Sequence, residues 1–388
     1  MGILVISWNF PPRVGGLENL IAGLCCGLKK KHSLVVITSW ASGAADRDER
    51  VLRPRWPGLP VFFIFALFRG FLVLRRNPEI KWILGGSALV CPLVLVLARL
   101  LRRKSIILVH GLDVIYPRRV YQALCVRALR FCDRIVPNSR YTLSLAEEKG
   151  ISRERLVVIP PGIDDGPRPS HGAEEVKVEF GVTRKKVLLY VGRLARRKGL
   201  KEFLQNSFPR IVAEVPEVCF LIVGGNPTES LVHHEDVAGE LKGQIQSMKM
   251  QDRIRLLGWL GDDDLAKVYR AADLMVLPAL AMKNDVEGFG IVVIEAAAAG
   301  LPAVATRVGG IPDAIEDGMS GILVDANAYE DMTRTIVNLL HDGEKRRILS
   351  DYARKRAAEK FSWERIAKQY DAVFEAVAST APSDIERR

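Results

Sequence analysis

The sequence lacks the features that mark membrane-spanning and exported proteins. Its longest apolar run is shorter than the about 18 to 20 residues that cross a bilayer, and it contains Pro92 before Arg99 ends it. The first apolar strand begins at Ile3, which leaves no room for a charged and hydrophobic leader. We therefore expect no spanning helix and a cytoplasmic location.

Cysteine pairs and common binding signatures are also missing. The six cysteines contain no Cys-x-x-Cys pair and lie in apolar or helical surroundings, which favours reduced packing thiols over disulfides or zinc ligands: Cys25, Cys26, Cys91, Cys125, Cys132 and Cys219. The Gly15-Gly16 turn does not have the Gly-x-Gly-x-x-Gly spacing of dinucleotide-binding turns. Helix-turn-helix, zinc-finger and aromatic-basic sheet patterns, which indicate nucleic-acid binding, are absent as well.

The chain does contain enough apolar sequence for two domains. It has 388 residues and is 48% apolar, which is too long for one ordinary core. Residues 1–165 carry 25 Lys and Arg against 12 Asp and Glu, or +13, and the remainder carries 31 against 33, or −2. The cations interleave with apolar stretches at 61–74 and 88–101, so we expect the N-terminal domain to contact an anionic membrane surface. A solvated basic surface over ordinary core helices is the alternative.

Short apolar runs alternate with amphipathic segments, as in parallel sheets covered by helices on both faces. In the first half we predict strands at residues 3–7, 34–38, 82–84, 105–109, 134–137 and 156–159. The predicted helices of this half are residues 17–30, 61–76, 88–103, 120–131 and 141–149. A polar segment with Pro167, Pro169, Ser170 and Gly172 then predicts a linker between domains.

A second alternating unit follows the linker. Its predicted strands are residues 186–191, 218–223, 254–257, 274–277, 303–306 and 321–324, and its predicted helices are 201–215, 238–248, 263–271 and 291–299. A last amphipathic helix begins after Ser362, a good N-cap, and is expected to pack back on the first domain. The predicted domains are residues 1–165, completed by a helix at about 362–380, and residues 175–360.

Two carboxylates bracket a glycine-rich turn and an apolar helix in the segment Glu287-Gly-Phe-Gly-Ile-Val-Val-Ile-Glu295. With about 1.5 Å of rise per helical residue they lie up to about 12 Å apart, more than the roughly 5 to 9.5 Å of a hydrolytic carboxylate pair. Free N–H groups at a helix N-terminus favour phosphate. The segment suits an elongated ligand with hydroxyls at both ends and phosphates between them, which is the shape of a nucleotide sugar. A surface loop with one incidental glutamate is the alternative.

A basic turn follows the first strand of the second half. Arg193 and Lys198 lie beside a predicted helix start, where two cations can stabilise a departing diphosphate without a metal. Arg196 and Arg197 lie between them, and we expect both to face solvent. The alternative is a charged loop without a ligand.

Two turns of the first half follow strands at the edge where open α/β sheets bind ligands. Gly15 and Gly16 form a tight turn at a helix start. His110 and Asp113 follow a later strand, where the histidine can hydrogen-bond a sugar hydroxyl or a backbone carbonyl. The carboxylate can orient it or accept from an acceptor hydroxyl. A turn without a ligand and a structural histidine are the alternatives.

One acidic cluster is expected to be structural. Asp262, Asp263 and Asp264 resemble metal ligands, but they follow a strand and open a helix. Carboxylates at that place cap the helix and complement its dipole. We therefore predict capping and no metal site.

Taken in order, these motifs resemble family 4 of the retaining glycosyltransferases. The resemblance covers essentially the whole chain and rests on Gly15-Gly16-x-Glu18, His110-Gly-x-Asp113, Pro161-Gly162-Ile163-Asp164, Gly192-Arg193 to Lys198-Gly199, and Glu287 to Glu295. Residues 9–16 and 285–292 look most like the phosphatidylinositol mannosyltransferase branch and its bacterial relatives. Asp313 departs from the pattern, since relatives usually carry glutamate there.

The resemblance implies the GT-B fold, an α/β architecture of two Rossmann-like domains with parallel sheets facing an inter-domain cleft. It implies a retaining transfer of a hexose from GDP-mannose or a UDP-hexose to a hydroxyl of a glycolipid or polysaccharide. The N-terminal domain would bind the acceptor and the C-terminal domain the donor. No metal and no cofactor is expected, and the protein would contact the inner membrane face peripherally.

The resemblance also implies residue roles. Arg193 and Lys198 would bind the donor diphosphate, Glu287 the sugar and Glu295 the ribose, with His110 near the sugar 6-hydroxyl. We take His110, Arg193, Lys198 and Glu287 as the catalytic candidates. The other donor-binding candidates are Gly15, Gly16, Asp113, Gly258, Gly288, Phe289, Gly290 and Ile291. Backbone groups around Gly258 and Trp259 would recognise the base.

Two other functions stay open at this point. A nucleotide-sugar epimerase can use the same two-lobed architecture, but it needs acid/base residues on both faces of the sugar, and the sequence does not supply them. A basic nucleic-acid-binding protein would fit the net charge of +11. It predicts a steeply salt-dependent affinity for DNA or RNA.

Overall fold

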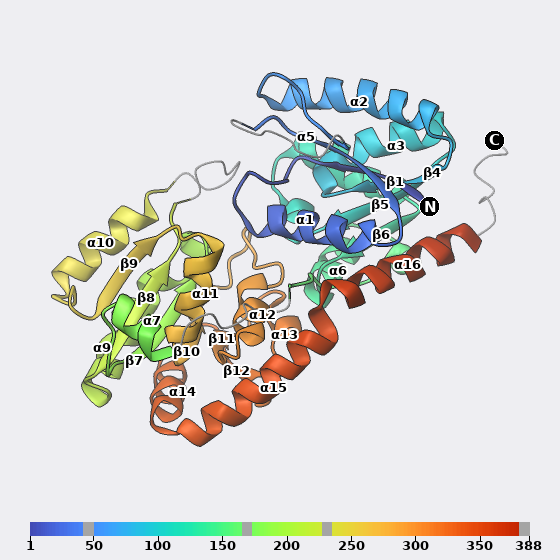
Figure 1. Cartoon of the computed structure of the whole chain (residues 1–388). Helices are drawn as coiled ribbons and strands as arrows, with labels where there is room; N and C mark the ends of the chain where they lie inside the picture. The colour runs from blue at the N-terminus through green and yellow to red at the C-terminus, as the bar shows by residue number, and fades with distance from the viewer. Residues whose placement is uncertain (42–49, 165–172, 227–234, 380–388) are drawn as a thin grey trace. The chain divides into compact units, whose positions relative to one another are not determined.

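The computed structural model describes residues 1–41, 50–164, 173–226 and 235–379 (Figure 1). The chain divides into two compact units, Met1–Asp164 with Ser362–Arg388, and Asp165–Phe361. Each unit has its own six-stranded parallel sheet, which confirms the predicted α/β class. The predicted linker with Pro167 and Pro169 lies outside the described residues.

The first sheet has the order β3-β2-β1-β4-β5-β6. Its strands are β1 (Gly2–Ser7), β2 (Ser33–Thr38), β3 (Val51–Leu52), β4 (Ile80–Gly85), β5 (Lys104–Val109) and β6 (Arg134–Pro137). Every residue of β1 is buried, as is typical of a parallel strand covered by helices on both faces. The strand order reverses between β1 and β4, and ligands of open α/β sheets bind at the carboxyl end of such a point.

Helices cover both faces of the first sheet. Figure 1 shows α2 and α3 on one side of the strands and α1 with α16 on the other. The helices of this unit are α1 (Gly16–Lys29), α2 (Leu59–Arg76), η1 (Ala88–Val90), α3 (Cys91–Leu100), α4 (Leu112–Ile115), α5 (Arg119–Tyr121), η2 (Gln122–Val126), η3 (Leu129–Phe131), α6 (Arg140–Glu148), η4 (Arg153–Arg155) and α16 (Trp363–Ser379). The predicted continuous helix 120–131 is therefore a succession of short α, π and 3-10 turns.

The predicted strand at residues 156–159 is wrong. Leu156 makes only an isolated bridge to Ile135, and the N–H groups of Val157 and Ile159 donate to β6 carbonyls. Two prolines follow at residues 160 and 161. Because proline has no N–H to donate, the pairing cannot extend into a regular strand.

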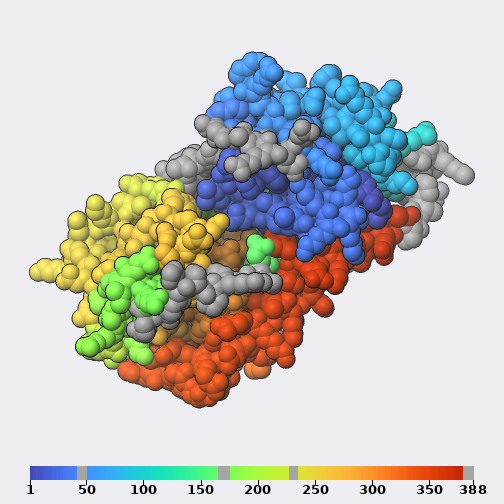
Figure 2. Space-filling view, in the orientation of Figure 1, coloured from blue at the N-terminus to red at the C-terminus, as the bar shows by residue number. Residues whose placement is uncertain are grey.

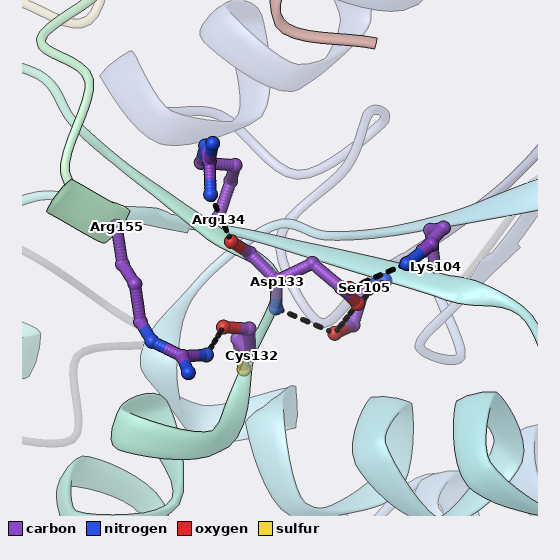
Figure 3. Close-up of polar contacts among 6 residues, drawn as sticks. All are labelled: Lys104, Ser105, Cys132, Asp133, Arg134 and Arg155. Carbon is purple, nitrogen blue, oxygen red and sulfur yellow. Dashed lines mark hydrogen bonds and ion pairs between the residues drawn. The ribbon is translucent and has the colours of Figure 1, made fainter. Parts of the chain in front are cut away.

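Asp133 connects the beginnings of β5 and β6 (Figure 3). Its carboxylate accepts from the Ser105 N–H at 2.8 Å, from the Ser105 hydroxyl at 2.9 Å and from Lys104 Nζ at 3.3 Å. Arg134 and Arg155 donate to the backbone carbonyls of Asp133 and Cys132. These contacts satisfy polar groups at the amino edge of the sheet, away from the edge where a ligand is expected, so we interpret the cluster as structural.

The second sheet has the order β12-β11-β10-β7-β8-β9. Its strands are β7 (Lys186–Val191), β8 (Val218–Val223), β9 (Ile254–Gly258), β10 (Leu274–Leu277), β11 (Ala303–Thr306) and β12 (Gly321–Val324). Its helices are α7 (Ala173–Glu179), η5 (Arg196–Lys198), α8 (Leu200–Asn206), α9 (Phe208–Glu214), α10 (Val237–Ser247), α11 (Asp262–Ala271), α12 (Ile291–Ala298), α13 (Ile311–Ala314), α14 (Tyr329–His341) and α15 (Gly343–Phe361). The order reverses between β7 and β10.

The last helix, α16, belongs to the first unit and packs against α1, as predicted. The Trp363 indole at its start lies against two glycines. A Cβ at Gly23 would come within 2.1 Å of the indole, and one at Gly162 within 2.3 Å. The side chain of Trp363 therefore needs the space that the missing glycine side chains leave. Farther along α16, the Asp371 carboxylate lies 2.7 Å from His32 Nε2 and makes a second contact of this helix with the rest of the first unit.

We predict that Gly23→Ala destabilises the protein by about 1–3 kcal/mol, because the added methyl overlaps the Trp363 ring. Gly243→Ala is the matched control, since Gly243 also lies within a helix but has nothing within 4 Å of its ideal Cβ. There the better helix propensity of alanine should stabilise by about 0.5–1 kcal/mol. Urea denaturation of both variants measures the difference, and an equal stabilisation of the two would contradict the packing.

Candidate functional site

The candidate site of the second unit lies at the carboxyl edge of its sheet, where the strand order reverses. The turn after β7 and the loop after β10 meet there. The Leu280 N–H donates to the Arg197 carbonyl at 2.7 Å. Gly199 has φ +68°, and a Cβ on it would lie 1.9 Å from the Pro278 carbonyl oxygen. Only glycine fits such a position, so the two segments form one connected scaffold.

The Glu287 carboxylate is the centre of a buried charge network. Lys198 Nζ lies 2.7 Å from Glu287 Oε2, and the Arg197 guanidinium pairs with the same oxygen. Arg197 Nε lies 3.1 Å from Asp285 Oδ1. The exposed fractions of the Arg197, Lys198 and Glu287 side chains are only 8%, 6% and 11%. These charges therefore interact in a medium of low dielectric constant.

The prediction that Arg197 faces solvent is wrong. Arg196 is exposed, as predicted, whereas Arg197 and Lys198 in the same short turn are buried. The signal that could have identified Arg197 is Asp285. Two carboxylates at positions 285 and 287 require matching cations once they are buried, and Lys198 supplies only one.

The surroundings shift the pKa values of Glu287 and Lys198. Burial acts to raise the pKa of Glu287, but the nearby Arg197 and Lys198 charges outweigh it and lower this pKa to about 2. Burial, assisted by the positive charge of Arg197, lowers the pKa of Lys198 to about 8 against the attraction of Glu287. Glu287 is thus an anion at neutral pH, and Lys198 loses its charge in mildly alkaline solution.

Arg193 is held by contacts to its backbone. The buried Tyr190 hydroxyl donates to the Arg193 carbonyl at 2.9 Å. Next to it, a Cβ on Gly224 would lie 2.0 Å from the Gly192 carbonyl oxygen. The turn after β7 therefore packs directly on the turn after β8. The Arg193 side chain is half-buried.

The segment from Gly288 to Ile291 contributes backbone to the site. Gly290, with φ +85°, is the N-cap of α12 and has no side chain with which to cap it. The Phe289 side chain is buried and packs edge-on against Phe361. Unpaired N–H groups at the start of a helix are suited to a phosphate.

The backbone of this segment is fixed from a second loop. The Gly310 N–H donates to the Glu287 carbonyl at 2.9 Å. A Cβ on Gly309 would lie 2.2 Å from that carbonyl oxygen, and one on Gly310 would lie 1.9 Å from the Gly288 carbonyl oxygen. The second loop thus lies against the back of the Glu287 segment.

Glu295 lies on α12 and is half-buried. The Tyr269 hydroxyl donates to its Oε2 at 3.0 Å. Burial raises the pKa of Glu295, and the hydrogen bond from Tyr269 opposes the rise only in part. No ion pair of Glu295 is found in the described ranges, so its environment differs from that of Glu287.

Gly258 is the last residue of β9, and the aspartate cluster follows this strand. The Gly258 carbonyl accepts from the Gly224 N–H at 2.7 Å, and Trp259 is exposed. Asp262, Asp263 and Asp264 form the first turn of α11, where they complement the helix dipole. The predicted side-chain capping is wrong, since the N-cap is Gly261. Within the described residues no group of three or more His, Cys, Asp or Glu side chains could hold a metal ion.

The candidates of the first unit lie after β1 and β5. His110 Nε2 is 2.8 Å from the carbonyl oxygen of Gly86, which follows β4. Asp113 contacts the backbone and not the imidazole, since its carboxylate accepts from the N–H groups of His110 at 2.7 Å and Ala88 at 3.0 Å. His110 Nδ1 is buried, and no hydrogen-bond partner for it lies among the residues the structure describes.

The glycine turn after β1 is organised by Glu18. Asn9 Nδ2 donates to Glu18 Oε1 at 2.6 Å, and a Cβ on Gly15 would lie 2.4 Å from Glu18 Oε2. Gly16 is the exposed first residue of α1. The structure therefore gathers Gly15, Gly16, His110 and Asp113 at the carboxyl edge of the first sheet. Arg193, Gly258, Lys198, Glu287 and Glu295 belong to the second.

Comparison with known proteins matches both halves of the chain. Residues 14–166 match the family described as Glycosyltransferase Family 4, and residues 173–356 match Glycosyl transferases group 1. A D-inositol 3-phosphate glycosyltransferase of Segniliparus rotundus is 30% identical over 366 residues, which cover 93% of this chain and 75% of the relative. A GDP-mannose-dependent alpha-(1-6)-phosphatidylinositol monomannoside mannosyltransferase of Mycolicibacterium smegmatis is 26% identical over 375 residues, covering 93% and 95%.

Solved structures show the same fold. HepE of Anabaena, crystallised with UDP and glucose, has a TM-score of 0.79 at 19% identity and covers 97% of this chain and 100% of its own. Sucrose-phosphate synthase of Thermosynechococcus elongatus has a TM-score of 0.80 at 20% identity, covering 98% and 100%. These likenesses confirm the predicted GT-B fold. The two family matches and the Segniliparus relative show that this chain belongs to glycosyltransferase family 4 and is a glycosyltransferase.

Proposed function

We propose that the enzyme transfers a hexose from a nucleotide sugar to a hydroxyl of a glycolipid or polysaccharide and retains the anomeric configuration. The observation that carries the proposal is the charge of the cluster in the second unit. Arg197 and Lys198 contact the Glu287 carboxylate, Arg197 also lies 3.1 Å from Asp285, and the two carboxylates lie on the segment that leads into α12. Such a place favours the diphosphate of a sugar donor.

The donor in this proposal is GDP-mannose or a UDP-hexose. The mycobacterial relative is named for its dependence on GDP-mannose, and HepE was crystallised with UDP and glucose. Arg193 and Lys198 bind the diphosphate, and Glu295 accepts from the ribose. Backbone groups near Gly258 bind the base. The acceptor class rests on the lipid named in the mycobacterial relative.

Glu287 accepts hydrogen bonds from the sugar hydroxyls. Arg197 and Lys198 both contact its Oε2, so its second oxygen, Oε1, is available to a ligand. Because the pKa of Glu287 is about 2, the carboxylate stays ionised and does not act as a general acid near neutral pH. The charge also stabilises an oxocarbenium-like sugar in the transition state.

Retention follows from transfer on one face of the sugar. The bond between the anomeric carbon and the phosphate oxygen breaks, and the acceptor oxygen bonds to the same face. The acceptor proton passes to the departing phosphate oxygen. Arg193 and Lys198 stabilise the charge that develops there, and this proposal requires no metal ion and no protein nucleophile.

Family membership favours transfer over the two alternatives from the sequence. Neither the epimerase nor the nucleic-acid-binding protein is supported by the matched families or by the relatives described above. Product analysis distinguishes a transferase from an epimerase, since an epimerase converts the donor sugar and a transferase releases free nucleotide.

We predict that the purified enzyme slowly hydrolyses its donor and releases UDP or GDP. Arg193→Ala combined with Lys198→Ala should lower this rate by about 10³-fold or more, because the leaving diphosphate loses both cations. Arg196→Ala, an exposed neighbour, is the control and should leave the rate unchanged. A thermal-shift panel of UDP- and GDP-sugars identifies the donor to use. Undiminished release by the double variant would refute the assigned roles.

We predict that kcat/KM for the donor falls as the pH rises through about 8. Lys198 is cationic below its pKa of about 8, so the positive charge that attracts the diphosphate is present at lower pH and is lost above it. The limiting fall is about tenfold per pH unit. In Lys198→Arg the cation persists to high pH, and the alkaline decline near pH 8 should disappear. The same decline in that variant would assign it to another group.

We further propose that the first unit contacts an anionic membrane through α2. The residues Phe62, Ala66, Gly70 and Leu74 form the buried stripe of this helix. Ile64 and Phe68, on another face, are 72% and 62% exposed. Arginines follow at positions 75 and 76. Figure 2 shows the light-blue residues of α2 on the open surface of this unit. No helix among the described residues is long and apolar enough to cross a bilayer.

We predict that Ile64→Glu with Phe68→Glu weakens binding to vesicles containing anionic phospholipid by about tenfold or more, because apolar insertion is lost and negative charge is added. Ile348→Glu in α15 is the matched control, since Ile348 is 56% exposed in the second unit. Vesicle sedimentation measures both. Equal binding by the paired variant and the control variant would argue against α2 as the contact.

A further inference from the structure

Arg197 is a buried cation to which the proposed donor site gives no role. Its guanidinium pairs with Glu287 through Nη1 and lies 3.1 Å from Asp285 Oδ1 through Nε. Its carbonyl accepts from the Leu280 N–H at 2.7 Å, which fixes its backbone to the loop that carries both acids. The side chain is only 8% exposed. Both carboxylates therefore interact with its charge, and little of the Arg197 side chain is accessible to a diphosphate.

The contacts on Glu287 are arranged asymmetrically. Lys198 Nζ and the Arg197 guanidinium both contact Oε2. The Gly310 N–H holds the Glu287 carbonyl at 2.9 Å. Backbone and one carboxylate oxygen are thus fixed, which determines where Oε1 points.

Lys198 cannot fix Glu287 alone once a donor is bound. Its ammonium is a compact point charge on a flexible stem, and the proposed diphosphate competes with Glu287 for it. Arg197 has a planar fork and a second ion-pair partner in Asp285, so its contact with Glu287 does not depend on Lys198. A glutamate held by Lys198 alone would lose its orientation at the moment the sugar arrives.

We propose that Arg197, supported by Asp285, is a positioning residue that orients Glu287 toward the donor sugar and does not bind the diphosphate. This proposal rests on the proposed function, because it assigns the sugar to Glu287. Two parts of the donor affinity then depend on different residues. The nucleoside diphosphate part depends on Arg193 and Lys198, and the additional affinity from the sugar depends on Arg197.

The test compares dissociation constants for UDP and UDP-glucose, and for GDP and GDP-mannose, by calorimetry. In Arg197→Met the affinity for the nucleoside diphosphate should stay within about threefold, while the additional affinity from the sugar should fall by about tenfold, the equivalent of one charge-assisted hydrogen bond. Arg196→Met, at the exposed neighbour, should change neither. An equal loss for the diphosphate and the sugar nucleotide would make Arg197 a phosphate ligand and overturn the proposal.

A double-mutant cycle distinguishes positioning from general support of the fold. If Arg197 acts through Glu287, adding Arg197→Met to Glu287→Gln should cause no further loss of the sugar's contribution. Additive losses would overturn the proposal. Arg197→Lys keeps the charge but not the fork and serves if the methionine variant does not fold. It should lose part of the sugar contribution, and unaltered sugar affinity in it would also overturn the proposal. A wild-type protein that binds none of the four nucleotides would instead remove the proposed function itself.

Discussion

The buried ion pairs of Glu287 with Arg197 and Lys198 are the interaction on which the candidate site depends. They join the turn after β7 to the loop after β10, two segments about 90 residues apart that meet where the strand order reverses. Removing one partner from such a pair costs about 3–5 kcal/mol, because it leaves a buried charge without compensation. The cluster is therefore a structural connection as well as the proposed set of ligand groups, so the stability of each variant must be measured beside its activity.

Close backbone approaches make this cluster possible. Glycines at positions 199, 224 and 310 let the four loops after β7, β8, β10 and β11 come within distances that a Cβ would prevent. The backbone segments that carry the charges are thereby held close together, as a preorganised electrostatic site requires. The same compactness explains the pKa of Lys198. The loss of hydration on burial destabilises the charged ammonium more than the shared carboxylate stabilises it. The pKa of Lys198 therefore falls to about 8, and its charge depends on pH in mildly alkaline solution.

The two units have the same strand order, but the side chains beside their sheets differ in chemistry. In the first, His110 Nε2 contacts the Gly86 carbonyl, the Asp113 carboxylate accepts from the N–H groups of His110 and Ala88, and an exposed apolar face lies on α2. In the second, the loops carry opposite charges packed together. This division agrees with the proposal that the second unit binds the charged donor and that the first presents a surface to lipid.

Local patterns in the sequence predict most of the regular elements and the places of the loops that carry the candidate site. Continuous apolar runs such as residues 186–191 and 218–223 form buried strands, as a short run of apolar residues predicts. The strand order and the burial of Arg197 beside the exposed Arg196, in contrast, depend on contacts between distant segments. The two arginines are adjacent in one basic turn, so no local pattern separates them. Their difference comes from Asp285 and Glu287, which folding brings to one of them and not to the other.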